Sequence, residues 1–342
     1  MKNAEYWRAR FEDLEKARHA VTAKQARQMM AMFAETSRQI ERETLAWYAR
    51  LAANNGVSLN EARRLLRGRD LEEFRWTVQE YIRKARESAI TGAWVKELEN
   101  ASARVHVTWL DDIQMRIRND VEYLYRDYEA FFSDAVRSSY VTAYGHTAYE
   151  IQRGLGTGWA VSGVDPRKLE RILARPWAPD GSNFSDRIWH SKDKLLSTLY
   201  QELTRSTITG EDPKKAIERL SAVMGTSKAN AGRLIMTESA YFSELGKGDS
   251  FRELDVEEYE IVATLDDKTS EICQDMDGKH FPMSQYEPGV TAPPFHPNCR
   301  TTTAPYFKDH GGGSRAMRQP GGRTEQVPAD MNYKEWSAKY LR

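Results

Sequence analysis

The sequence contains little cysteine and no long apolar run. Two cysteines in 342 residues are too few for the disulfide framework of a secreted domain, so reduced thiols and a cytoplasmic compartment are expected. No run of about 18 apolar residues occurs, so no transmembrane helix is expected. The first residues also lack the apolar core of a signal peptide. We therefore expect an intracellular protein with no membrane partner.

The chain has no net charge either, because 50 Lys and Arg balance 50 Asp and Glu. A sequence-wide argument for nucleic-acid binding therefore fails, which leaves only a local basic face as a route to DNA. The H-E-x-x-H, G-x-S-x-G and P-loop motifs are absent as well, and with them the usual signs of a zinc protease, an α/β-hydrolase or a nucleotide-binding enzyme. An enzyme acting on a small-molecule substrate is not expected.

Helix signals dominate the first 153 residues. Trp7, Leu14 and Val21 recur every seven residues, and a second apolar series resumes the interval in a shifted phase. Charged residues fill the positions between them, a pattern typical of helices packed on helices. Helical periodicity continues to about Ile151 with few breakers. We predict an elongated N-terminal helical bundle over residues 1–153, without strands.

A glycine-rich stretch marks a domain boundary, with four glycines among the twelve residues 154–165. Helices are expected from 166, over 185–208 and over 213–225, and in a further segment capped by Ser227. The alternation of apolar and polar residues around Tyr259 and Ile261 then predicts a strand, with partner strands at Phe281 and over 301–306. The expected fold is mainly α with a C-terminal α+β domain, 154–307, in which a helical layer covers a small antiparallel sheet.

The last residues read as a linker and a tail. Residues 308–328 are glycine-rich and poor in apolar side chains, which predicts a flexible tether. Met331, Trp336 and Tyr340 then form a short amphipathic tail, completing a third region over 308–342.

The composition changes sharply between Thr264 and Arg300. Both cysteines lie there, among aspartates, prolines and two histidines. The order is D-D-x-T-S-x-x-C, then D-G-K, then P-P-x-H-P-x-C-R. We call residues 264–303 the signature segment, and its marked positions are Asp266, Thr269, Cys273, Asp277, Gly278, Pro294, His296, Cys299 and Arg300.

Cys273, His296 and Cys299 are candidate zinc ligands. The x-x spacing from His296 to Cys299 allows both side chains to face one ion, and a hairpin could return Cys273 to the same point. A fourth ligand would come from Asp267, Asp277 or His280, and Asp267 completes the candidate set. Two other interpretations stay open, a purely structural hydrogen-bonded cluster and chemistry at a thiol. The residues favour the hydrogen-bonded cluster.

The ordered motifs of the signature segment resemble those of the phage Mu F-like minor head proteins, also called phage head morphogenesis proteins. The run Arg233-Leu-Ile-Met-Thr-Glu-Ser and the strand ending at Thr264 are also similar to that family, and the resemblance covers roughly residues 190–307. Many members carry a further cysteine directly after the final Cys-Arg, where this chain has Thr301.

The resemblance implies a minor capsid protein of the phage head that acts in head morphogenesis. Its implied partners are the portal, the scaffold or the inner shell, with contact to packaged DNA as a further possibility. Its implied location is the virion, and the host cytoplasm during assembly. The alternative is an enzyme that acts on a host or viral target through Cys273, His296, Cys299 and Asp267. An enzyme should expose Cys299 and His296 in a concave site, whereas an assembly protein should bury them.

Overall fold

The computed structural model describes residues 3–53, 66–88, 90, 92–104, 106–158, 160–177, 180–209, 211–307, 314–318 and 324–328. The chain forms two compact units, each built from separated stretches. The helical unit comprises residues 28–131 and 185–232. The sheet unit comprises residues 1–27, 132–184 and 233–342. Three long helices, α1 (Ala4–Ala53), α5 (Trp109–Leu155) and α8 (Pro213–Glu253), contribute residues to both units.

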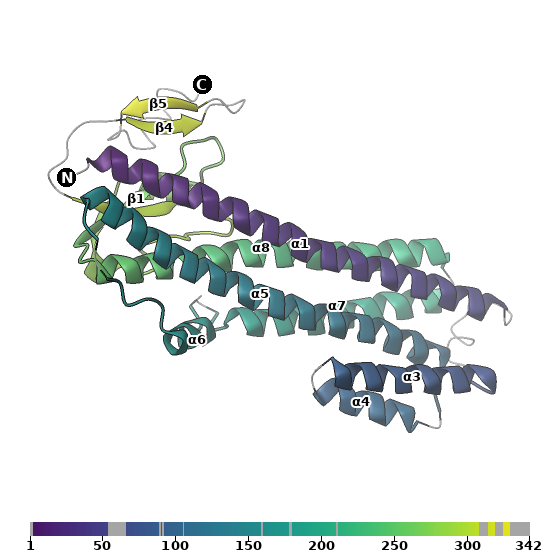
Figure 1. Cartoon of the computed structure of the whole chain (residues 1–342). Helices are drawn as coiled ribbons and strands as arrows, with labels where there is room; N and C mark the ends of the chain where they lie inside the picture. Colours follow the sequence, from purple (N-terminus) through teal and green to yellow (C-terminus); the bar gives the residue numbers. More distant parts are fainter. Residues whose placement is uncertain are drawn as a thin grey trace. The chain divides into compact units, whose positions relative to one another are not determined.

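The helical unit also contains α3 (Arg69–Glu87), α4 (Gly92–Ser102) and most of α7 (Phe184–Thr209). Helices α3 and α4 pack side by side as a hairpin (Figure 1). The interior is apolar and rich in aromatic rings, because each helix turns its periodic apolar stripe inward. Phe33 of α1 meets the rings of Tyr125 and Tyr128 edge to face, and Trp47 is fully buried and donates to the Trp109 carbonyl at 2.8 Å.

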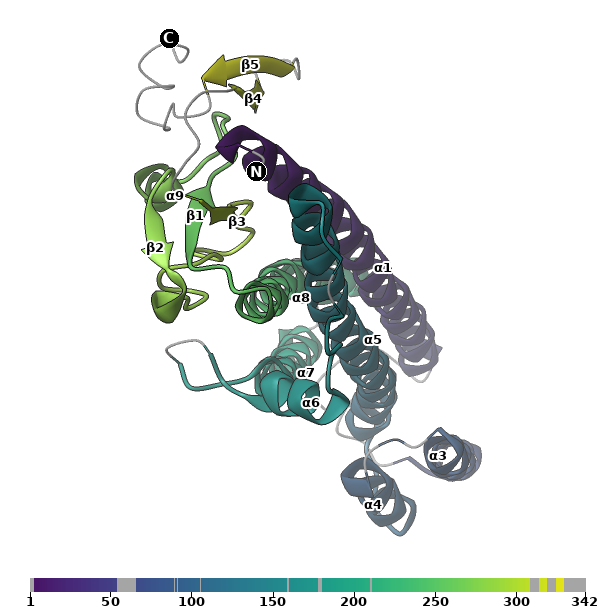
Figure 2. The same ribbon diagram turned by 60° about the vertical axis from the view of Figure 1, so that its left-hand side comes forward.

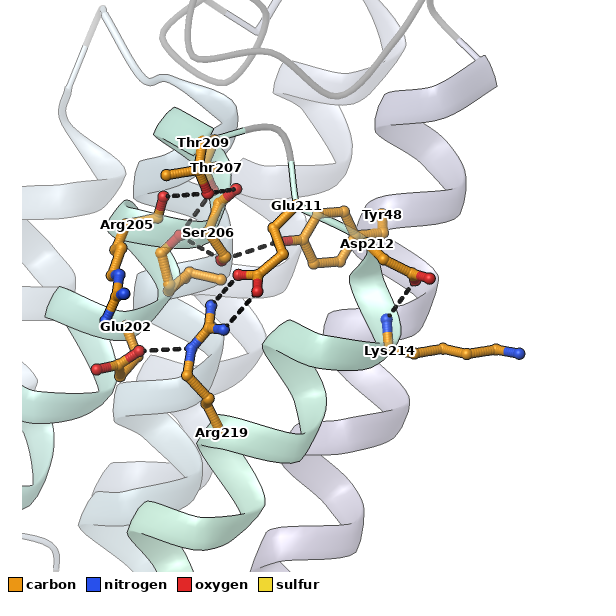
Figure 3. Close-up of polar contacts among 11 residues, drawn as sticks. Tyr48, Glu202, Arg205, Ser206, Thr207, Thr209, Glu211, Asp212, Lys214 and Arg219 are labelled. Carbon is orange, nitrogen blue, oxygen red and sulfur yellow. Dashed lines mark hydrogen bonds and ion pairs between the residues drawn. The ribbon is translucent and has the colours of Figure 1, made fainter.

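Polar contacts fix the connection between α7 and α8 (Figure 3). Arg219 of α8 reaches back to Glu202 of α7, with Nε to Oε2 at 2.7 Å, and to Glu211 in the connection, with Nη1 to Oε1 at 2.7 Å. The Asp212 carboxylate accepts from the Lys214 backbone N–H at 2.9 Å and so satisfies a free amide at the start of α8. One guanidinium thus joins two acidic side chains at this turn.

The sheet unit holds a three-stranded antiparallel sheet in the order β2–β1–β3. Strand β1 (Glu258–Val262) pairs with β2 (His280–Pro282) and with β3 (Thr302–Tyr306), and Figure 2 shows it between the other two. These positions confirm the predicted strand and both predicted partners. In the described residues no strand precedes β1, so the fold class is confirmed as mainly α with a C-terminal α+β part.

Helices cover the sheet and build its core. Apolar residues of α1, α5 and α8 pack with those of β1 and β3, and the buried set includes Trp7, Phe11, Ile151, Phe251, Tyr259, Ile261, Tyr286 and Ala304. Helix α8 approaches α5 closely at Gly246, where a Cβ atom would lie 2.3 Å from the Tyr140 carbonyl oxygen. Only glycine tolerates that approach. The short helix α6 (Pro166–Ala174) also belongs to this unit, and Asp165 caps it as its sequence predicts.

From Tyr259 to Val262 both faces of β1 are covered, so the charged residue Glu260 is buried as well. Glu260 is 2% exposed and forms an ion pair with Arg8 of α1, whose Nε lies 2.8 Å from Oε2. His280 Nε2 lies 3.4 Å from the same carboxylate. Burial raises the pKa of Glu260, but hydrogen bonds from His280 and Arg8 outweigh it and the net shift is downward.

Two details of the helices differ from the sequence prediction. Helix α8 runs unbroken through Met224, Gly225 and Ser227, where the sequence predicted a stop and a new cap. One interior glycine costs about 1 kcal/mol, which packing of a long helix readily exceeds. Val21 of the heptad series is 57% exposed. An α-helix drifts about 20° per heptad against a strict seven-residue repeat, so burial in α1 passes to other positions, such as Ala26 and Met29.

The C-terminal region contains a hairpin within the range that was predicted to be a flexible tether. Strand β4 (Ser314–Arg318) pairs antiparallel with β5 (Thr324–Pro328), so these ten residues are not a flexible tether. Composition alone suggests a linker, but Gly-Gly between two short alternating stretches is also a hairpin signal. The predicted tail with Met331, Trp336 and Tyr340 lies outside the described residues. No helix in the described part of the chain is long and apolar enough to cross a membrane.

Candidate metal centre

Cys273 is positioned by a short helix that follows the turn after strand β1. Ser270 precedes α9 (Glu271–Met276), and the Gln274 side chain donates to the Thr269 carbonyl at 2.6 Å, which ties the helix to the turn. Cys273 lies on the inner side of α9 and is 2% exposed. The helix therefore presents one thiol to the interior of the signature segment.

The second thiol and the imidazole come from a tight turn between His296 and Cys299. The Cys299 backbone N–H donates to the His296 carbonyl at 3.2 Å. Asn298 has a φ of 59°, a left-handed conformation that asparagine tolerates better than most residues. The turn brings the two side chains to the same side, as their x-x spacing predicts.

Cys273, His296 and Cys299 meet at one point. The sulfur of Cys273 lies 3.2 Å from His296 Nε2 and 3.6 Å from the sulfur of Cys299. The three ligand atoms all lie within 4.8 Å of one another, and no other group of three such side chains occurs in the described residues. Asp267, the predicted fourth ligand, is exposed and outside this group. Two further candidates, Asp277 and His280, have other roles in the sheet.

Hydrogen bonds orient the ligand atoms. His296 Nδ1 lies 2.8 Å from the Pro297 carbonyl, so it carries the proton that donates to that oxygen, and Nε2 faces the thiols. Cys273 and Cys299 are coupled through their sulfurs. The hydrogen bond from Cys273 lowers the pKa of Cys299, aided by His296 and by the backbone N–H of Thr301. The same interaction, with burial, raises the pKa of Cys273. The hydrogen bond to Cys299 raises the pKa of His296.

Asp266 and Arg300 form a latch across the segment. The guanidinium donates to both carboxylate oxygens, at 2.6 and 2.7 Å, in the bidentate geometry that suits arginine. Burial raises the pKa of Asp266, but the hydrogen bonds and charge of Arg300 outweigh it and the net shift is downward. Asp266 also accepts from the Lys268 backbone N–H at 3.0 Å and from the Thr269 hydroxyl at 3.1 Å. The Asp266 carboxylate thus joins the turn at Lys268 and Thr269 to Arg300, which lies just before β3.

Asp277 and Gly278 join the end of α9 to the sheet. The Asp277 carboxylate accepts from the Ala263 backbone N–H at 2.8 Å, just after β1 ends. Gly278 has a φ of 76°, which favours glycine, and its N–H donates to the Ile261 carbonyl at 2.9 Å. Pro294 is buried in the turn before His296. The marked positions of the signature segment therefore have identifiable structural contacts.

A small cavity of about 40 Å³ opens beside the three ligand atoms. Cys273 and His296 line it together with Ser270 and Thr301, whereas Cys299 does not. Ser270 Oγ is buried, and its hydroxyl is directed at the sulfur of Cys273. The sequence did not predict that Ser270 and Thr301 would lie beside the cluster. Ser270 belongs to the D-D-x-T-S-x-x-C motif, and Thr301 stood out only as a departure from the resembled pattern.

The chain was compared with known proteins in three ways. The family model described as Phage Mu protein F like protein matches residues 197–304. That range contains the second half of α7, all of α8, strands β1 and β2 and the first residues of β3, and it includes the three clustered side chains. A search of curated proteins and a search of solved structures each find no significant match.

Proposed function

We propose, on the premise that residues 197–304 are a Phage Mu protein F like region, that this chain is a minor head protein acting in phage head morphogenesis. That family match is the observation that carries the proposal. It confirms the resemblance drawn from the signature motifs, and it indicates a head protein and hence a component of the virion. We propose that the folded chain contacts other head proteins.

The closed state of the signature segment supports a structural role. Cys273 and Cys299 are each 2% exposed, and Cys299 does not reach the adjoining cavity. A thiol nucleophile must be accessible to its substrate, even when its pKa is low. The lowered pKa of Cys299 favours the alternative, an enzyme acting through this cluster, and so does the partial exposure of His296 in the adjoining cavity. The burial of Cys299 favours a cluster that locks the loops together.

We propose a protein partner, the portal, the scaffold or the inner shell, in preference to DNA. The equal numbers of basic and acidic residues give the chain no overall attraction to a polyanion. Many of its arginines are also paired with carboxylates, as Arg83 is with Glu80 and Glu87. Paired charges of this kind suit the polar rim of a protein interface. Assembly would take place in the host cytoplasm before the protein enters the head.

Deletion of the gene from its phage tests the proposal. Shells should still assemble, while infectious yield and head maturation fall, because a minor head protein is not the shell itself. Particle composition by mass spectrometry should show this chain in wild-type heads only. A plasmid copy of the full chain should restore the yield, and so should a copy carrying Asp267→Asn at an exposed position of the same segment. Normal infectious yield without the chain would contradict the proposal.

Cross-linking in purified heads identifies the partner. Cross-links to the portal, the scaffold or the inner shell protein are expected in the particles that contain the chain. If the cross-linked material is DNA alone, the protein-partner part of the proposal is wrong even where the deletion phenotype is as expected.

A further inference from the structure

We propose that Cys273, His296 and Cys299 bind one zinc ion, and that water held in the adjoining cavity supplies the fourth ligand. This site does not depend on the role in the phage head, because it follows from the side-chain geometry alone. The protein supplies three ligands, and solvent takes the fourth position in place of Asp267.

The distances between ligand atoms fit a tetrahedral ion. With Zn–S bonds of about 2.3 Å and Zn–N bonds of about 2.0–2.1 Å, two sulfurs lie about 3.8 Å apart and a sulfur and a nitrogen about 3.5 Å apart. The two sulfurs here are 3.6 Å apart, and Cys273 Sγ and His296 Nε2 are 3.2 Å apart. Binding therefore requires shifts of only a few tenths of an ångström. Soft thiolates with an imidazole are the donor set that zinc prefers over magnesium or calcium.

The surroundings orient the ligands as in a metal site. Metal-bound histidine commonly donates its second ring N–H to a carbonyl or carboxylate, which fixes the tautomer. His296 does this through Nδ1 to the Pro297 carbonyl and directs Nε2 at the thiols. The backbone N–H of Thr301 is directed at the sulfur of Cys299. The tight turn and helix α9 hold both sulfurs in place without a covalent link.

The cavity supplies the open position. A volume of about 40 Å³ exceeds the roughly 10–15 Å³ that one water molecule requires. Cys273 and His296 line the cavity, and so do Ser270 and Thr301. The buried Ser270 hydroxyl is directed at the sulfur of Cys273, and it lines the cavity in which a zinc-bound water would sit. Thr301 is 4% exposed, and its hydroxyl is directed at the sulfur of Cys273.

The position of Thr301 allows a test in which binding increases. Thr301→Cys places a third thiolate beside the ion, in place of water. The full chain is purified under reducing conditions, its zinc content is measured by elemental mass spectrometry, and affinity is measured by competition with a chelator. We expect about one zinc per wild-type chain, and binding tightened by at least about tenfold in Thr301→Cys. Unchanged affinity in Thr301→Cys would overturn the open fourth position.

Ligand variants and cobalt complete the test. Cys273→Ser, His296→Ala and Cys299→Ser should each weaken zinc binding by at least about tenfold, whereas Asp267→Asn should bind as wild type. Cobalt(II) in the wild-type chain should give the absorption of a tetrahedral, thiolate-ligated ion, a readout that does not depend on the folding of any variant. If the reduced wild-type chain binds neither zinc nor cobalt, or if the ligand variants bind zinc as tightly as wild type does, the proposal is wrong.

Discussion

The helical unit and the signature segment are held together by different interactions. In the helical unit, large side chains such as Phe33, Trp47 and Tyr128 are fully buried along helical stripes. In the signature segment the fixed points are polar: the Asp266–Arg300 latch, the Asp277 bond to Ala263 and the clustered thiols. Apolar burial is non-directional and tolerates repacking, whereas polar latches require specific partners. Substitutions should therefore act by size in the first region and by hydrogen-bonding ability in the second.

Asp120 in the helical unit and Asp266 in the signature segment show how hydrogen-bond partners change the pKa of a desolvated carboxyl group. Asp120 of α5 is desolvated among helices, and its Oδ2 has no hydrogen-bond partner in the described structure. Burial, followed by the charge of Glu43, raises its pKa to about 8. Asp266 is also buried, yet Arg300 and local donors satisfy it and hold its pKa below the ordinary value. The partner, more than the burial, decides which form of the carboxyl the fold favours.

The largest effect is expected from Trp47→Ala in the helical unit. The side chain is fully buried, and its indole N–H donates to the Trp109 carbonyl. Its loss leaves a cavity and should lower the free energy of unfolding by about 3–5 kcal/mol. Denaturant unfolding of the full chain measures this. As a control, Trp76→Ala at a side chain that is 69% exposed should change stability by less than about 0.5 kcal/mol. Similar losses in both variants would show that burial does not govern this region.

Asp120→Asn should increase stability at alkaline pH. Because the folded pKa lies above the unfolded value, the folded state holds a proton that the unfolded state has lost, and stability falls as pH rises from about 4 to about 8. Relative to the variant, the wild-type chain should lose about 2–4 kcal/mol between about pH 5 and about pH 9. If the free energy of unfolding varies with pH in the same way for both proteins across this range, the raised pKa of Asp120 is refuted.

Asp266→Asn should show the opposite pH dependence. The folded pKa of Asp266 is lowered, so its contribution is present above the unfolded pKa, near 4, and is lost as pH falls through the folded value. The variant should be about 1.5–3 kcal/mol less stable at neutral pH, because it loses a charged hydrogen-bonded pair. The difference from wild type should shrink in acid. The neighbouring Asp267→Asn, at an exposed site, serves as the matched control. An equal loss of stability in that variant would show that the Asp266–Arg300 pair is not the cause.

Gly278→Ala should give the smallest of these losses, about 1–2 kcal/mol, because an L-residue is strained at a φ of 76°. Thermal unfolding of the full chain measures it. Gly225→Ala in the interior of α8, where a Cβ atom meets nothing within 4 Å, should be neutral or stabilising. If both glycine-to-alanine substitutions change stability in the same direction and by the same amount, backbone conformation is not what distinguishes the two sites.

Periodicity predicted the elements well, since it reflects how side chains meet across helices and strands. The stripes of α1 and α5 and the strand around Tyr259 all follow from it. It could not predict that Gly225 would stay helical, because that outcome depends on packing along a helix of 41 residues. Nor could it predict the burial of Glu260, whose partner Arg8 lies 252 residues away in the sequence.

The candidate site was predictable in its residue types and not in its partners. Two cysteines and a histidine in a turn-rich segment pointed to one cluster, which the structure brings together. The fourth candidate, Asp267, is exposed, because its neighbour Asp266 takes the inward position facing Arg300. Only one of these two adjacent carboxylates is buried, and the sequence does not say which one. The cavity beside Ser270 and Thr301 likewise arises only from the folded arrangement.

We expect polar contacts to hold the signature segment as firmly as the strands it adjoins. Hydrogen exchange in the full chain tests this at single amides. The Ala263 N–H, which donates to Asp277, and the Gly278 N–H, which donates to the Ile261 carbonyl, should exchange as slowly as the amides of β1 that pair with β3. Rapid exchange at Ala263 and Gly278 beside protected β1–β3 amides would show that polar contacts do not hold the segment.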